Sequence, residues 1–200
     1  MSINKLEKEL EAAKKRLEQA NGIDEFKLAH TTVLSLERKL AAERMEEFAD
    51  TIDFPVKWDV GAPMPYLIAN GLHTILIFYK QDENLENDGV ESIALVQFYR
   101  CASVKLGDPN DEVFHGHPLY GKGIEPYNAQ IVRNSKWIKE LEAINKVHSN
   151  YNQELWSTLK HYVFWFHDET FECVAKSYEV EVFHKSMDEV VMEATKRALV

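Results

Sequence analysis

The stretch with the most unusual chemistry is residues 114–123, which read Phe-His-Gly-His-Pro-Leu-Tyr-Gly-Lys-Gly. Two histidines, three glycines and a proline fit neither helical nor strand periodicity, which predicts a loop. On an extended backbone, His115 and His117 would point to the same side, an arrangement that is common among metal ligands. The alternative is a loop in which one histidine packs and the other forms hydrogen bonds, without any metal.

The same stretch offers groups that suit an organic or anionic ligand. The backbone N–H groups of Gly121-Lys122-Gly123 could hold an anion together with the lysine, although the Ser or Thr of a Walker motif is missing. Tyrosine and tryptophan rings can line a pocket for a small molecule. The residues expected to bind a ligand are therefore His115, His117, Tyr120, Lys122 and Trp165, with His115 and His117 as the ligands of any metal.

A second cluster lies in residues 166–172, Phe-His-Asp-Glu-Thr-Phe-Glu. A histidine beside carboxylates has the components of a general acid and base, so His167, Asp168 and Glu172 are the candidate catalytic residues. The alternative is an ordinary turn, because Asp and Thr favour turns. Strands flank both clusters, and adjacent strand ends would bring His117 and His167 together. Cys173, between apolar residues, is interpreted as a small buried side chain rather than a nucleophile.

Composition narrows the possible functions. The chain has 200 residues, of which 45% are hydrophobic and 28% charged, as in a soluble protein with a core. A net charge of −10 argues against nucleic acid or an anionic membrane as the partner. We find no apolar run of about 20 residues, no signal peptide and only two cysteines, so the expected location is a reducing cytoplasm. These features identify no cofactor.

The composition changes near residue 50, which predicts two domains, 1–50 and 51–200. All six prolines and all four tryptophans lie beyond that point. Before it, apolar residues recur at the 3,4 spacing of a coiled-coil seam, with Asn21-Gly22 as a break and Asp24 as the cap of the second helix. The two seams contain Ile3, Leu6, Leu10, Ala13, Leu17 and Ala20, and Phe26, Ala29, Val33, Leu36 and Leu40. This pattern predicts an antiparallel helical hairpin.

The narrow seams leave apolar residues on the flanks of the hairpin, namely Leu28, Leu34, Met45 and Phe48. A two-fold pairing would cover them with one self-complementary surface, so we expect a homodimer held at least partly by the hairpin. Deletion of residues 1–49 is then expected to leave a folded β domain that forms a smaller assembly.

The second half reads mainly as strands, because β-branched and aromatic residues recur between turn signals. Asn70-Gly71 predicts a type I′ hairpin turn, and residues 81–89 an exposed loop. Ser135 and Ser186 are placed to cap two helices, at 136–147 and 187–199, with one more helical turn or two at 154–159. The expected strands are 54–58 at an edge, 65–69, 72–79, 91–106, 129–133, 161–166 and 171–183.

Short links between strands favour antiparallel pairing, and helices kept apart from the strands favour an α+β fold. We therefore predict an N-terminal antiparallel helical hairpin, followed by a mostly antiparallel, curved sheet or half-barrel with two helices. About seven twisted strands rarely form a flat sheet, which is why curvature is expected.

Four stretches together resemble a family of uncharacterised bacterial proteins marked by HGHPLYGKG and FHDxTFE segments. The stretches are residues 110–123, Asn134-Ser-Lys-Trp137, Asn145-Lys-Val-His148 and 161–173. The chain departs from the pattern at Ile124, where Leu is expected, and at Glu169, where Ser is expected. The likeness covers residues 54–183 and carries no activity. It implies that the two histidine-bearing segments belong together.

Three functions follow from these observations. The first is a binding domain for a small molecule or anion, in which 107–124 and 166–172 form a polar mouth over an aromatic pocket. The second is an enzyme in which His115, His117, His167, Asp168 and Glu172 converge for acid/base or metal-assisted chemistry. The third is a protein-interaction module that acts through the hairpin. For the first two, Gly116→Val is expected to damage the site, because a Cβ between the two histidines is expected to be excluded.

Overall fold

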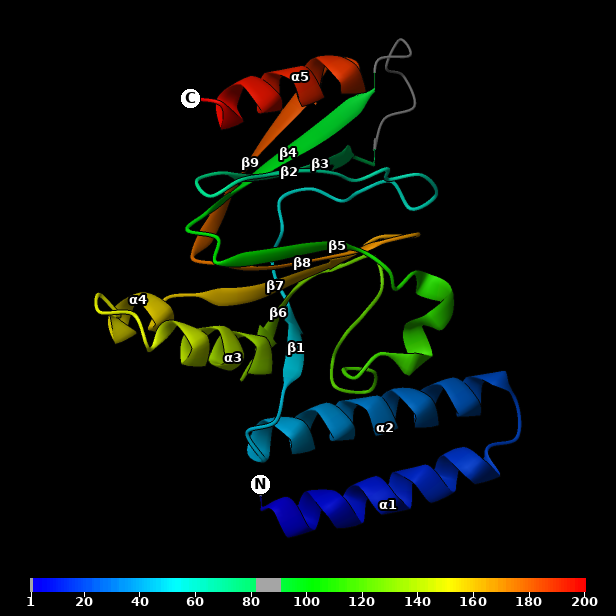
Figure 1. Cartoon of the computed structure of the whole chain (residues 1–200). Helices are drawn as coiled ribbons and strands as arrows, with labels where there is room; N and C mark the ends of the chain where they lie inside the picture. The colour runs from blue at the N-terminus through cyan, green and yellow to red at the C-terminus, as the bar shows by residue number, and fades with distance from the viewer. Residues whose placement is uncertain (1, 82–90) are drawn as a thin grey trace.

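The computed structural model describes residues 2–81 and 91–200, so most of the expected loop 81–89 lies outside them. Its layers are stacked in the order helix, sheet, sheet, and then helices and a loop (Figure 1). The helices are α1 (Ile3–Gln19), α2 (Ile23–Glu43), the 3-10 helix η1 (Asp111–Gly116), α3 (Lys136–Asn145), α4 (Gln153–Ser157) and α5 (Met187–Ala198). The strands are β1 (Phe48–Thr51), β2 (Tyr66–Ala69), β3 (Thr74–Tyr79), β4 (Ser92–Tyr99), β5 (Ser103–Gly107), β6 (Ala129–Arg133), β7 (Lys160–Trp165), β8 (Thr170–Ala175) and β9 (Ser177–His184).

The strands form two open sheets in which every neighbouring pair is antiparallel. One has the order β1-β6-β7-β8-β5 and the other β2-β3-β4-β9. The predicted α+β class with an N-terminal helical hairpin and antiparallel pairing is therefore confirmed. The strands are divided between two sheets that pack face to face.

A β-bulge carries the chain from one sheet to the other. Tyr99 pairs with Ser177 and Ser103 pairs with Val174, so three residues on one strand face two on its partner. Arg100, in the bulge, has a φ of 51°. An extra residue of this kind bends and twists the ladder. The single strands predicted over 91–106 and 171–183 are consequently each two strands, β4 with β5 and β8 with β9.

Aromatic side chains fill the space between the sheets. Phe98 from the four-stranded sheet lies 5.2 Å from Phe171 and 5.9 Å from Phe164 of the other sheet, between ring centroids. Cys173 is fully buried in this core, as the sequence predicted. Burying rings of this size supplies much of the apolar stabilisation of the fold.

Helix α5 covers the outer face of the four-stranded sheet (Figure 1). It begins with a capping box in which Ser186 and Glu189 exchange hydrogen bonds, so the predicted cap is confirmed. Its interface is apolar and contains Ile75, Ile77, Ile93 and Leu95 from the sheet and Met187, Val190 and Ala194 from the helix.

The hairpin formed by α1 and α2 lies beyond the five-stranded sheet (Figure 1). The predicted seam is buried at Leu6, Ala13, Val33 and Leu40. Asp24 does not cap α2. The cap position is Gly22, whose φ of 107° suits glycine, and Asp24 lies in the first turn. Of the flanking residues, Leu28 and Met45 are exposed, whereas Leu34 and Phe48 are partly buried.

Two local predictions are wrong in detail. Residues 70–73 join β2 to β3, because Ala69 pairs with Thr74, and the Asn70 side chain accepts hydrogen bonds from two backbone N–H groups of the turn. Neither Asn70 nor Gly71 has a positive φ, so this Asx turn replaces the type I′ turn. Residues 54–58 form no strand, and only Trp58 makes an isolated bridge, to Lys80.

Candidate functional site

Polar side chains gather on the outer face of the five-stranded sheet. Along β7, Tyr162 and Phe164 point into the core, so His161 points to the outer face, because successive side chains in a strand alternate. On the neighbouring strands, Glu172 of β8 pairs with Lys105 of β5. The result is a row of ionisable groups over a sheet whose inner face is apolar.

His161 and Glu172 form a hydrogen-bonded chain with Ser135, which precedes α3. The Nδ1 atom of His161 lies 2.9 Å from Ser135 Oγ, and its Nε2 atom lies 2.8 Å from Glu172 Oε2. Ser135 is 4% and His161 5% exposed, so both residues are largely shielded from water, whereas the Glu172 side chain is 22% exposed. Ser135 Oγ also accepts a hydrogen bond of 3.2 Å from Ile138 N, which makes Ser135 the N-cap of α3, as predicted.

The protonation of Glu172 fixes the direction of the chain. Burial by itself raises the pKa of the Glu172 carboxyl, but the hydrogen bond from His161 and the charges of His161 and Lys105 outweigh it, and the pKa is lowered overall. An ionised carboxylate only accepts hydrogen bonds, so His161 Nε2 carries the proton. When the ring is neutral, Nδ1 is then an acceptor, and the Ser135 hydroxyl can donate to it.

Lys105 and Trp137 complete the surroundings of this chain. The indole of Trp137, on α3, meets the His161 ring edge to face with 5.1 Å between centroids. Lys105 Nζ lies 3.7 Å from the centroid of Trp137 and 3.7 Å from Glu172 Oε1. The lysine therefore contributes both an ion pair and a cation–π contact at the exposed end of the chain.

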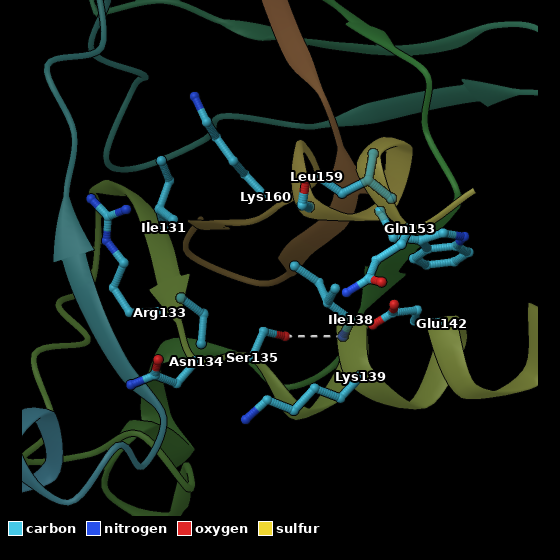
Figure 2. A pocket seen from close by; sticks show the side chains of 13 residues that line it. Ile131, Arg133, Asn134, Ser135, Ile138, Lys139, Glu142, Gln153, Leu159 and Lys160 are labelled. Carbon is cyan, nitrogen blue, oxygen red and sulfur yellow. Dashed lines mark hydrogen bonds between the residues drawn. The ribbon is translucent and has the colours of Figure 1, made fainter. Parts of the chain in front are cut away.

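A cavity of about 360 Å³ adjoins Ser135, between the end of β6 and helices α3 and α4 (Figure 2). In this view three basic side chains lie toward the left, and Glu142 and Gln153 lie toward the right. The cavity is lined by Ile131, Val132, Arg133, Asn134, Ser135, Ile138, Lys139, Glu142, Gln153, Trp156, Ser157, Leu159 and Lys160. Its walls thus combine apolar surface with a few polar groups, as ligand sites usually do.

The basic groups at the cavity differ in their partners. Arg133 Nε is 2.8 Å from Asp50 Oδ2. Lys139 and Lys160 have no carboxylate within 4.0 Å among residues 2–81 and 91–200. Glu142 accepts a hydrogen bond from Tyr151 and lies 3.7 Å from Lys146. Lys139 and Lys160 thus line the cavity as exposed lysines without a carboxylate partner in the described part of the chain, and their side chains extend in different directions from it (Figure 2).

The two histidines of the 114–123 stretch have different neighbours. His115 lies in the last turn of η1, is exposed, and has its ring 4.9 Å from that of Tyr120. His117 packs edge to face on Trp165 at 5.1 Å, and its Nδ1 accepts a hydrogen bond from Leu119 N. Burial lowers the pKa of His117, although the Glu172 charge opposes this. The extended His-x-His geometry is therefore wrong. The described part of the chain contains no group of three His, Cys, Asp or Glu that could hold a metal.

The rest of this stretch contacts the hairpin. Tyr120 Oη lies 3.3 Å from His30 Nε2, and Lys122 Nζ lies 3.1 Å from Glu46 Oε2, so a carboxylate already pairs with Lys122. Gly123 has a φ of 94°, and a Cβ there would lie 2.3 Å from Ala49 O. A Cβ on Gly116 would meet nothing within 4 Å, so the expectation that Gly116 excludes a side chain is wrong. The glycines that permit close approach are Gly121 and Gly123.

The turn between β7 and β8 is exposed. His167 Nδ1 lies 2.9 Å from Asp168 Oδ1, and this hydrogen bond raises the pKa of His167. The carbonyl of His167 accepts a hydrogen bond from Asp111 N, while His117 packs on Trp165, so the two histidine segments run side by side. Glu172 lies apart from this turn and has His161 as its partner.

Sequence reasoning did not identify Ser135, His161 and Lys105 as functional candidates. Ser135 was interpreted only as a helix cap, and His161 only as the start of a strand. A usable signal was nonetheless present. His161 and Glu172 occupy outward positions in strands that are otherwise almost wholly apolar, and a polar residue there requires a partner.

The comparisons supply no relative. No family model, no curated protein and no solved structure matches the chain. Within the described residues, no helix combines the length and apolar character needed to cross a membrane.

Proposed function

We propose that the protein binds a small anionic molecule in the cavity between β6, α3 and α4. The observation that carries this proposal is the pair of uncompensated lysines, Lys139 and Lys160, at a cavity of about 360 Å³. A ligand with a negative charge would supply the counter-ion that both lysines lack among the described residues, in a chain whose net charge is −10.

The helix at the cavity adds to the attraction. Ser135 and Ile138, in the first turn of α3, line the cavity, and a helix N-terminus carries a partial positive charge. Ile131, Leu159 and Trp156 provide the apolar wall against which the uncharged part of a ligand would pack. A small molecule with an anionic group and an apolar body fits both features.

Calorimetric titration of the full-length protein with inorganic phosphate and with succinate tests this proposal. We expect at least one of the two ions to bind, with an affinity that falls as salt is added. The double variant Lys139→Ala/Lys160→Ala should bind at least about tenfold more weakly, which corresponds to about 1.4 kcal/mol.

The matched control is Lys196→Ala, which removes an exposed lysine from α5 on the far side of the four-stranded sheet. Its affinity for the ions should equal that of the wild type. Equal affinity in the double variant, or no binding of either ion at millimolar concentration, would overturn the proposal.

A further inference from the structure

We propose that Ser135 is the nucleophile of an acyl-transfer reaction, with His161 Nδ1 as its general base. The substrate class is a small carboxylic ester that carries an anionic group. This inference rests on the proposed function, because the same cavity would hold the substrate beside Ser135.

The hydrogen bonds of the chain have the direction that such a reaction needs. Ser135 Oγ lies 2.9 Å from His161 Nδ1, to which its hydroxyl can donate when the ring is neutral, and His161 Nε2–H donates to Glu172 over 2.8 Å. A serine hydroxyl is a weak nucleophile until a neighbouring base takes its proton, and a carboxylate on the other ring nitrogen holds that base in the right tautomer. Glu172 is thus a positioning residue, and Ser135 and His161 are the catalytic residues.

Ser135 lies in the short connection between β6 and α3. Asn134 has a φ of 55°, and its side chain donates a hydrogen bond to Glu46 O. The next residue, Lys136, donates its backbone N–H to Glu47 Oε1 over 2.6 Å. Ser135 is therefore fixed from both sides, at the N-terminus of α3, where partial positive charge can stabilise a developing oxyanion.

The reaction balances with water as the second substrate. Ser135 Oγ forms a bond to the ester carbonyl carbon while its proton passes to His161 Nδ1. The carbon–oxygen bond to the alcohol then breaks, and Nδ1 returns the proton to the leaving oxygen. Water attacks the acyl-serine, again losing a proton to Nδ1, and the acid is released as Ser135 recovers its hydrogen.

The apolar and charged parts of the cavity define the substrate class. Ile138, Leu159 and Trp156 would contact the hydrocarbon part of the acid or alcohol, and Lys139 and Lys160 would contact the anionic group. A cavity of about 360 Å³ is at the small end for organic ligands, which excludes long-chain esters.

An uncharged fluorophosphonate, which reacts with activated serines, tests the proposal on the full-length protein. Intact mass and peptide mapping should show one adduct per chain, on Ser135. Ser135→Gly should show none, and its circular dichroism spectrum, compared with that of the wild type, checks that the variant is folded, since Gly is tolerated at a helix N-cap. His161→Gln should react at least about a hundredfold more slowly.

Two further variants separate chemistry from stability. Ser186→Gly removes the capping serine of α5, so it matches Ser135→Gly structurally and should still be labelled at Ser135. Glu172→Gln should lower kcat for p-nitrophenyl acetate with little change in KM, and Glu172→Asp should recover part of the loss, which a purely structural role would not produce.

The outcomes distinguish the two proposals. Absence of an adduct at Ser135 in the folded wild type, or equal labelling in His161→Gln, would overturn the catalytic inference. Binding of phosphate or succinate without labelling would do the same and leave the binding function intact. Labelling at Ser135 without binding of either ion would overturn the anion-binding proposal, and with it the anionic substrate class, and would leave Ser135 as the nucleophile.

Discussion

The outer faces of the two sheets are both covered by other elements, but they differ in the polarity of their side chains. Under α5, the four-stranded sheet presents isoleucine and leucine to a helix whose facing residues include Val190 and Ala194, both fully buried. The five-stranded sheet presents Gln130, His161 and Glu172 beside an apolar cluster that includes Val132, Val163 and Trp165. Its cover consists of α3, the loop that carries His117 and, beyond that loop, the hairpin.

This difference in polarity indicates that the outer face of the five-stranded sheet is not optimised for stability alone. An apolar interface gains free energy simply by excluding water. A buried polar group costs free energy unless every hydrogen bond is restored, and the exchange at best returns a modest net gain. The chain Ser135–His161–Glu172 satisfies its own polar atoms, yet a layer of leucines would stabilise the same face with fewer constraints. A binding or catalytic site is thus expected at the polar part of the outer face of the five-stranded sheet.

The largest effect is expected at the apolar face. Val190→Glu would place a carboxylate at a position that is 0% exposed, and the free energy of unfolding should fall by at least about 3 kcal/mol. Urea denaturation measures this change. Met192→Glu, on the exposed side of the same helix, should stay within about 0.5 kcal/mol of the wild type. Similar values for the two variants would mean that α5 does not seal a dry interface.

An intermediate effect is expected where the loop closes over the polar face. Gly123→Ala combines a strained positive φ with a Cβ 2.3 Å from Ala49 O, so the free energy of unfolding should fall by about 2 kcal/mol or more. Gly116→Ala is the matched control in the same stretch, where a Cβ meets no atom within 4 Å. Thermal unfolding of both variants should show a clear loss for the first and almost none for the second. The reverse order would contradict the docking of this loop on β1.

The smallest effect concerns the two histidines beside the polar face. Nuclear magnetic resonance titration should place the pKa of His117 below 6.5, because burial disfavours its charge, and that of His167 above 6.5, because Asp168 stabilises its charge. With a folded pKa lowered from the unfolded value, His117 contributes stability above pH 6.5 that is lost as the pH falls from 6.5 toward the folded pKa. His117→Asn should therefore flatten the pH dependence of stability in that range. A higher pKa for His117 than for His167 would show that His117 is not packed on Trp165.

Local sequence signals predict the helices and the helix starts, because these form through interactions between residues that are close together in the sequence. The 3,4 spacing of the two seams, which include Leu6 and Ala13 in one and Val33 and Leu40 in the other, identifies two helices, because the helical period places each set on one face. Ser135 and Ser186 mark helix starts for an equally local reason, since a cap bonds to a backbone N–H three residues on. Only part of the candidate site can be predicted from such local signals. Glu172 was singled out, but with His167 as its partner.

Only the tertiary structure decided which distant segments meet. The bulge at Arg100 divides two long β-rich runs between two sheets, and this division depends on pairing between residues some 75 positions apart, such as Tyr99 and Ser177. The chain Ser135–His161–Glu172 combines the end of β6, the start of β7 and the middle of β8, so no spacing in the sequence indicates it. The sequence by itself determined the polarity and period of each element, because these are properties of consecutive residues. The partner of each polar side chain was decided by strand register, because hydrogen bonds depend on position in space and not on order along the chain.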